Sequence, residues 1–164
     1  MKQIPAYMAV LSLLTLVLWA CQPQPDELVK KMIATDDMQQ FNLLAGKARS
    51  LGRDSIPIFS KVLDQSFENR FSLLSYGKVG TCLTQLHELA KEGIYSIDEV
   101  PVLVKAMRNQ IEITGTLVTA EILTIITGLN VGYSEQYVKE YRPADEPERQ
   151  AMIDAWEQWY KANK

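Results

Sequence analysis

Apolar residues recur every three or four positions along most of the chain beyond residue 25, which is the period of a helix with one buried face. The pattern predicts helices over residues 26–34, 36–51, 54–67, 70–91, 98–111 and 113–127, and a last helix after Asp145. Gly52, Gly93 and Gly128 follow three of these segments, where a glycine commonly ends a helix. Asp36 is the expected N-cap of the second helix. The sequence therefore predicts an all-α fold.

Residues 1–20 follow a different pattern, because their apolar residues are nearly continuous. Lys2 gives a short positive start, residues 6–19 are apolar except for Ser12 and Thr15, and Ala20 is small. This layout is typical of a secretory signal peptide. The run is shorter than the roughly 20 apolar residues that a membrane-spanning helix needs.

The end of this segment resembles the lipobox of bacterial lipoproteins. Leu18-Trp19-Ala20-Cys21 has Leu at −3, a small residue at −1 and Cys at +1, although Trp19 at −2 departs from the family's preference for small residues. The resemblance implies cleavage before Cys21, a diacylglycerol on its sulfur, and acylation of the new amine. The alternatives are a plain signal peptide with an incidental cysteine and an uncleaved anchor helix. Residues 21–25 then read as an extended, proline-containing tether.

An internal repeat is the most informative signal in the rest of the chain. Residues 54–63 (DSIPIFSKVL) reappear 44 residues later as residues 98–107 (DEVPVLVKAM), with Asp, Pro and Lys at the same positions and a matching apolar face. If Asp54 and Asp98 are N-caps, each proline falls at N3, where its missing N–H costs little. A second predicted helix follows each copy.

A helix pair that recurs every 44 residues lies within the 40–47-residue period of HEAT and armadillo repeats. The tail (residues 126–133, Glu148-Arg149 and Trp156-x-x-Trp159-Tyr160) is similar to the end of bacterial HEAT-repeat proteins. Residues 26–164 therefore resemble a HEAT-repeat domain. The resemblance implies a short right-handed α-solenoid of HEAT-like helix pairs with a C-terminal capping helix, and an adaptor or scaffold rather than an enzyme.

The last predicted helix has a strongly aromatic face. The apolar residues on this face are Met152, Ile153, Trp156, Trp159 and Tyr160. A repeat domain needs its open end covered, so we expect this helix to act as a cap. The alternative is an aromatic patch that binds a partner.

Few side chains in the sequence suggest chemistry. His87 is the only histidine, and Cys82 lies five residues away, so the two do not share a helix face. Glu121 flanks an apolar face and is the carboxylate expected to be partly buried, either paired with a neighbouring helix or reaching solvent, or as a ligand-binding group. Gly77 and Gly80 suggest close helix packing or, alternatively, a groove. No Gly-rich phosphate loop, serine-nucleophile elbow or zinc motif occurs, so we expect no catalytic residue, metal or cofactor.

Charge and cysteine content narrow the classes of partner. Loss of residues 1–20 removes one of the 17 basic residues and none of the 20 acidic ones, leaving a net charge near −4. This balance argues against nucleic acid, which favours a basic surface, and against polybasic binding to anionic lipids. With Cys21 assigned to lipid, Cys82 has no partner for a disulfide.

The sequence therefore predicts a lipid-anchored cell-envelope scaffold or adaptor that binds another envelope protein. By analogy with HEAT proteins, whose second helices line the concave side, the candidate partner-binding residues are Lys78, Gln85, Glu88, Thr116 and Thr119. The alternative is a lipoprotein that captures a small ligand or peptide for a transporter or sensor, with a pocket near Cys82, His87 or Glu121. If the host has two membranes, Gln22 in place of Asp favours the periplasmic face of the outer membrane.

Overall fold

The computed structural model describes residues 24–67, 73–109, 113–131 and 146–164. These residues form seven α-helices and two 3-10 turns, without a β-strand among them. The α-helices are α2 (Pro25–Ala34), α3 (Met38–Arg49), α4 (Ile56–Ser66), α5 (Leu73–Lys91), α6 (Val100–Asn109), α7 (Ile113–Thr127) and α9 (Glu146–Asn163), and the 3-10 turns are η1 (Gly52–Ser55) and η2 (Ile97–Glu99). The predicted all-α fold is therefore confirmed for the described residues.

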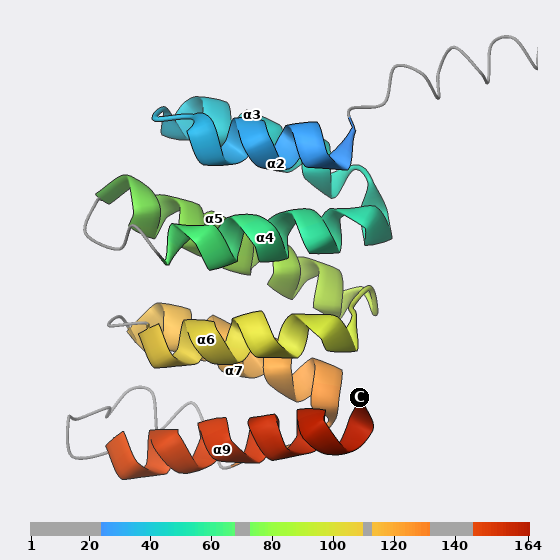
Figure 1. Cartoon of the computed structure of the whole chain (residues 1–164), viewed down its shortest axis with the longest axis vertical. Helices are drawn as coiled ribbons and strands as arrows, with labels where there is room; N and C mark the ends of the chain where they lie inside the picture. Colours follow the sequence, from blue (N-terminus) through green and yellow to red (C-terminus); the bar gives the residue numbers. More distant parts are fainter. Residues whose placement is uncertain (1–23, 68–72, 110–112, 132–145) are drawn as a thin grey trace, which may run out of the picture.

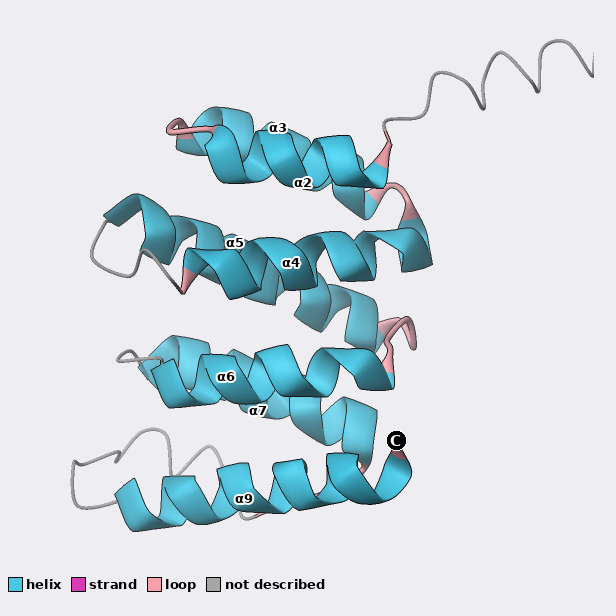
Figure 2. Cartoon of the chain, viewed as in Figure 1, coloured by secondary structure: helices cyan, strands magenta, loops and turns pink. Residues whose placement is uncertain are grey.

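The helices lie in two layers (Figures 1 and 2). Helices α2, α4, α6 and α9 follow one another in the first layer, and α3, α5 and α7 lie behind them in the second layer. Within each layer consecutive helices are in contact, and the pairs α2–α3, α4–α5 and α6–α7 are in contact across the layers. The chain thus alternates between the layers as it proceeds from one end of the stack to the other.

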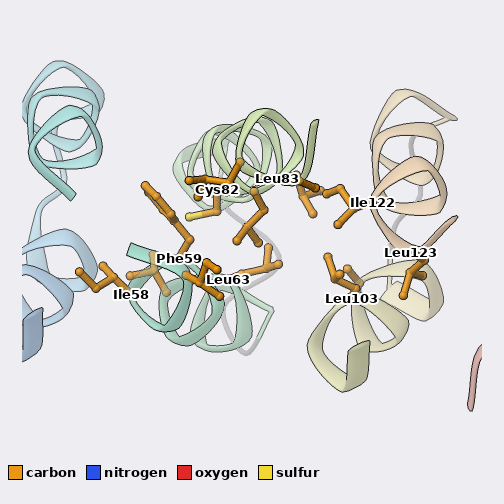
Figure 3. Packing of buried hydrophobic residues seen from close by; sticks show 14 of the residues in the cluster. Ile58, Phe59, Leu63, Cys82, Leu83, Leu103, Ile122 and Leu123 are labelled. Carbon is orange, nitrogen blue, oxygen red and sulfur yellow. The ribbon is translucent and has the colours of Figure 1, made fainter. Parts of the chain in front are cut away.

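The core fills the space between the layers. Figure 3 shows Phe59 and Leu63 of α4, Cys82 of α5 and Leu103 of α6 in this space, and all four are fully buried. The buried hydrophobic residues of all seven helices belong to one contiguous cluster. The apolar stripes read from the sequence are the faces that this cluster buries, which explains why the 3.6-residue period predicted the helices.

The predicted starts of α7 and α9 agree with the structure, whereas those of α2 and α3 are wrong by one residue. Asp37, not Asp36, is the N-cap of α3, and its carboxylate accepts a hydrogen bond of 2.7 Å from the backbone N–H of Gln39. Pro25 is the first residue of α2, so it does not belong to an extended tether. Proline suits this position because the first N–H groups of a helix have no intrahelical partner.

Both copies of the repeat begin with a 3-10 turn, which the sequence did not reveal. Ser55 is the N-cap of α4 and Ser96 is the N-cap of η2, so the prediction that Asp54 and Asp98 are N-caps is wrong. The repeat prolines consequently occupy the second position of α4 and of α6, where no N–H is needed. The two copies still start their helices in the same way, because each aspartate lies in the turn before its helix.

The predicted ends of α2, α5 and α7 agree with the structure, whereas α3 ends at Arg49 rather than at residue 51 and α4 at Ser66 rather than at residue 67. Gly52, Gly93 and Gly128 have φ angles of +60°, +77° and +69°. An L-residue with a side chain would be strained in this left-handed conformation, so glycine is the residue that allows the chain to turn after α3, α5 and α7. The predicted helical residues 70–72 and 110–111, residues 132–133 of the tail motif, the signal segment and Cys21 lie outside the described part of the chain.

Helix α9 closes one end of the stack through its apolar face. Met152, Ile153 and Trp156 are buried, while Trp159 and Tyr160 are partly buried against the core. The prediction that these residues share one packed face is confirmed. Trp156 is 0% exposed, so it is not part of an accessible aromatic patch.

Candidate functional site

The predicted partner surface is only partly exposed, and Lys78 is the clearest correction. Its side chain is 6% exposed, and its ammonium group donates a hydrogen bond of 2.9 Å to the carbonyl of Ile33 at the end of α2. The same nitrogen lies 5.6 Å from the centre of the Phe41 ring. Burial lowers the pKa of Lys78, although the negative charge of Asp36 acts in the opposite direction. Lys78 therefore links α5 to the end of α2, where a cation also suits the helix dipole.

Thr119 is also buried rather than available to a partner. It is 0% exposed, and its hydroxyl donates a hydrogen bond of 2.7 Å to the carbonyl of Gly115 one turn earlier. Threonine can be buried in a helix because its own backbone satisfies its hydroxyl. Of the two predicted threonines, only Thr116, which is half-buried, can reach a partner.

Gln85 and Glu88 remain candidates for the partner-binding surface. Gln85 is half-buried and Glu88 is exposed on α5. Glu88 lies 2.9 Å from the ammonium nitrogen of Lys91, and this hydrogen bond and charge lower the pKa of Glu88. Of the five predicted residues, then, Gln85, Glu88 and Thr116 reach the surface of the second layer.

Cys82, His87 and Glu121 do not form one site. Cys82 points into the core and is fully buried, and burial raises the pKa of its thiol well above the ordinary value (Figure 3). His87 lies on another side of α5, where its Nε2 is 2.8 Å from a carboxylate oxygen of Glu121 on α7. The expected pairing of Glu121 with a neighbouring helix is confirmed. In the described residues, no three His, Cys, Asp or Glu side chains are close enough to hold a metal ion.

Glu99, not Glu121, is the buried carboxylate. Glu121 is half-exposed, whereas Glu99 is 2% exposed. The Glu99 carboxylate accepts a hydrogen bond of 2.6 Å from the backbone N–H of Ser96, and the Ser96 hydroxyl accepts one of 3.2 Å from the N–H of Asp98. Burial raises the pKa of Glu99 to about 7, although the Ser96 hydrogen bond acts to lower it. Ser96-x-x-Glu99 is a capping box, a pattern that the sequence contains and that the choice of Asp98 as the cap obscured.

Glu99 lines a cavity of about 390 Å³ at the edge of the first layer. One wall comes from η1 and the first turns of α4, with Arg53, Ser60 and Lys61, and the other wall comes from the turn that precedes α6, with Asp98 and Glu99. Ile56 and Pro57 add an apolar surface. The cavity therefore joins the starts of the two repeat copies, which lie at the same edge of the stack in Figure 1.

Comparisons of the chain with protein-family models, with curated proteins and with solved structures found no match. The function is therefore inferred from the residues and contacts of this chain.

Proposed function

We propose that the protein is a lipid-anchored adaptor of the cell envelope that binds another protein through the outer face of the second layer. The domain that does so is a short right-handed α-solenoid of HEAT-like helix pairs, with α9 as its terminal cap. The observation that carries this proposal is that the lysine shared by both copies of the 44-residue repeat pairs, in each copy, with an aspartate of the preceding helix of the first layer.

That repeated contact is an ion pair within the first layer. Lys61 of α4 lies 3.1 Å from Asp26 of α2, and Lys105 of α6 lies 2.5 Å from Asp64 of α4. Lys61 and Lys105 occupy the same position of the repeat. Each exposed pair contributes little stability by itself, and the two aspartates lie at different positions, Asp26 in the first turn of α2 and Asp64 near the end of α4. The shared position of the two lysines supports a one-dimensional stack in which each unit contacts its neighbour.

The last helix suits the role of a cap. Arg108 of α6 lies 2.7 Å from Glu157 of α9, which extends the ion pairs of the first layer to the end of the stack. Gln150, Asp154 and Gln158 of α9 are exposed on its other side. A terminal repeat unit needs such a polar outer face for solubility, so α9 has the properties that the end of a solenoid requires.

We assign the partner surface to the second layer by analogy with HEAT proteins, whose second helices line the concave side. On α5, Thr84, Gln85 and Glu88 reach the surface, and Tyr76 is 42% exposed. Tyrosine is enriched at protein interfaces because it combines a large apolar ring with a hydrogen-bonding hydroxyl. We therefore assign the partner surface to Tyr76, Thr84, Gln85 and Glu88 of α5 together with Thr116 of α7; this set is called the α5 face below.

Cys21 supplies the proposed membrane anchor. Helix α2 begins at Pro25, so only three residues would separate an acylated Cys21 from the first helix of the stack. Two or more acyl chains hold a protein firmly at a membrane, whereas a single chain gives only reversible binding. Among the described residues, no helix has the length and apolar character needed to cross a bilayer. The proposed location is the envelope, with the periplasmic face of the outer membrane favoured in a host with two membranes.

The adaptor role is tested by crosslinking in cells, purification of the protein from the membrane fraction, and mass spectrometry of the attached proteins. We expect one dominant protein partner, and we expect Gln85→Ala combined with Glu88→Ala to remove it. The matched control likewise changes one acidic residue and one glutamine on α9, Asp154→Ala with Gln158→Ala, and should keep the partner. Recovery of the intact protein with no partner, or loss of the partner in the control alone, would overturn the proposal.

The anchor is tested by Cys21→Ala. We expect this change to abolish acyl labelling and to leave an unprocessed precursor or release the protein from the membrane fraction. Cys82→Ala is the matched control, because Cys82 is a buried core residue and its loss should leave labelling unchanged. Acyl labelling that persists in the Cys21 variant would refute the lipid anchor without bearing on the α5 face.

The alternative role, capture of a small ligand or peptide for a transporter or sensor, was expected to use a pocket near Cys82, His87 or Glu121. No observation favours it there, because Cys82 belongs to the core and the other two side chains bind each other.

A further inference from the structure

The cavity between the starts of α4 and α6 separates opposite charges onto its two walls. Arg53 and Lys61 belong to the η1–α4 wall, while Asp98 and Glu99 belong to the η2 wall. A ligand with a negative group at one end and a positive group at the other could therefore contact both walls at once. The volume of about 390 Å³ lies near the lower end of the range of small-molecule sites, roughly 300–1,000 Å³.

Two polar groups in the cavity wall have unused hydrogen-bonding capacity. The Ser60 hydroxyl oxygen is buried and has no hydrogen-bond partner among the described residues. The Glu99 carboxyl is 2% exposed and accepts one hydrogen bond, from Ser96, although a carboxylate can accept several. Buried polar groups are normally satisfied, so the cavity suits a ligand that donates to Glu99 on one wall and pairs with Ser60 on the other.

The cations differ in how far they are already engaged. Lys61 pairs with Asp26 at 3.1 Å, whereas the Arg53 guanidinium, within the described part of the chain, donates only a long hydrogen bond of 3.4 Å to the carbonyl of Tyr95. A guanidinium has five N–H donors and binds a carboxylate through two parallel hydrogen bonds. Arg53 is therefore the principal group for an incoming carboxylate, and Lys61 adds to the positive charge of that wall.

We propose that this cavity binds a small zwitterion of the size of an amino acid or a dipeptide, with its carboxylate at Arg53 and its protonated amine at Glu99. The proposal stands apart from the adaptor role, because the cavity belongs to the first layer and the α5 face to the second. The ligand spans η1, α4 and η2, so it joins two consecutive repeat units.

Binding of an amine at Glu99 requires the ionised carboxylate. The other charged groups that line the cavity are Asp98 on η2, Arg53 on η1 and Lys61 on α4. Because the pKa of Glu99 is about 7 in the free protein, the affinity for an ammonium group should increase as the pH rises through about 7. An uncharged amide at this position should remove that dependence.

The test is isothermal titration calorimetry of the full chain in a mild non-ionic detergent. The probes are L-alanine, L-alanyl-L-alanine, its N-acetyl derivative and its C-terminal amide. We expect at least one of the two zwitterions to bind, and both blocked peptides to bind about tenfold more weakly or not at all, since each loses a charge-assisted contact. Comparison of alanine with dialanine identifies which length of ligand the cavity accepts.

Variants connect the binding to this cavity. Arg53→Gln and Glu99→Gln should each weaken binding by about tenfold, and Glu99→Gln should also remove its pH dependence. Glutamine can still accept the Ser96 hydrogen bond, so the capping box and the fold are retained. Asp154→Asn on α9 is the control, because it removes an exposed carboxylate far along the chain and should leave the affinity unchanged.

Three results would overturn the proposal: no binding of either zwitterion at millimolar concentration, equal binding of the blocked peptides, or unchanged affinity in both cavity variants. None of these depends on a partner protein, since the titration uses the purified chain. Failure of the cavity proposal is therefore distinguishable from failure of the crosslinking experiment on the α5 face.

Discussion

Glu99→Gln should make the protein more stable above neutral pH, although it changes a side chain of a helix cap. In the wild-type protein the Glu99 carboxyl is buried and accepts a hydrogen bond from the Ser96 N–H. Glutamine has nearly the same size, and its carbonyl oxygen can accept the same hydrogen bond. The variant therefore differs from the wild type chiefly in being unable to carry a buried negative charge.

The magnitude follows from the pKa of Glu99, which burial raises from 4.5 to about 7. Each pKa unit corresponds to 1.36 kcal/mol, so the shift amounts to about 3 kcal/mol as an order of magnitude. Since the folded state holds the proton more tightly than the unfolded state, the free energy of unfolding is highest below the unfolded pKa. The contribution of Glu99 to the free energy of unfolding falls as the pH rises from about 4.5 to about 7, and it is constant at higher pH.

The assay is urea unfolding followed by circular dichroism at a series of pH values, for the wild type and for Glu99→Gln. The difference in unfolding free energy between the two proteins isolates Glu99, because the other titrating groups are shared. Relative to its value in acid, this difference should move in favour of the variant by about 3 kcal/mol between about pH 4.5 and about pH 7.

The control is Glu27→Gln, which removes an exposed carboxylate paired with Lys31 on α2. It should show at most a small pH-dependent difference, because exposed pairs of this kind contribute little. Parallel pH profiles for wild type and Glu99→Gln, or a wild type that gains stability relative to the variant as the pH rises, would refute the claim that Glu99 is buried with a raised pKa.

Two further changes test packing. Trp156→Ala should lower the free energy of unfolding by about 3–5 kcal/mol, because Trp156 is fully buried, and an unchanged denaturation midpoint would contradict the packed position of α9. Gly80→Ala should raise the free energy of unfolding by up to about 1 kcal/mol, because a methyl group at Gly80 meets no atom within 4 Å and alanine favours the helix. Gly77→Ala is the comparison and should gain less stability, because its methyl group would lie 2.9 Å from the sulfur of Met38. Equal gains in stability for the two variants, measured by thermal unfolding, would argue against close packing at Gly77.

The periodic pattern of the sequence predicted the helices and their buried faces, because the apolar residues of an amphipathic helix mark the face that it buries. It could not predict which polar residues the fold would bury. Lys78 lies one turn before Cys82 on the buried side of α5, yet lysine is ordinarily a surface residue. Its burial depends on the carbonyl of Ile33, which is 45 residues away in sequence and becomes a partner only when α2 and α5 meet.

The wrong choice of Glu121 as the buried carboxylate has a local cause. Glu121 borders an apolar helix and was therefore expected to be the partly buried acid, whereas its actual environment depends on His87 across the interface between α5 and α7. Glu99 was overlooked because the matching aspartates of the two repeat copies suggested a cap at Asp98. The first copy has no Ser-x-x-Glu pattern at the corresponding residues, so comparison of the copies drew attention away from the one that does.

The two proposed binding surfaces can be separated by substitution, because they lie on different layers. The cavity is formed by η1, α4 and η2 at the edge of the first layer, whereas the α5 face belongs to helices of the second layer. Glu99→Gln should therefore leave the crosslinked partner in place, and the Gln85 and Glu88 changes should leave zwitterion binding intact. If each variant instead abolished both activities, the cavity and the α5 face would be energetically coupled through the junction between the repeat units. A ligand at Glu99 would then regulate the binding of the partner, and the yield of crosslinked partner would depend on the concentration of that ligand.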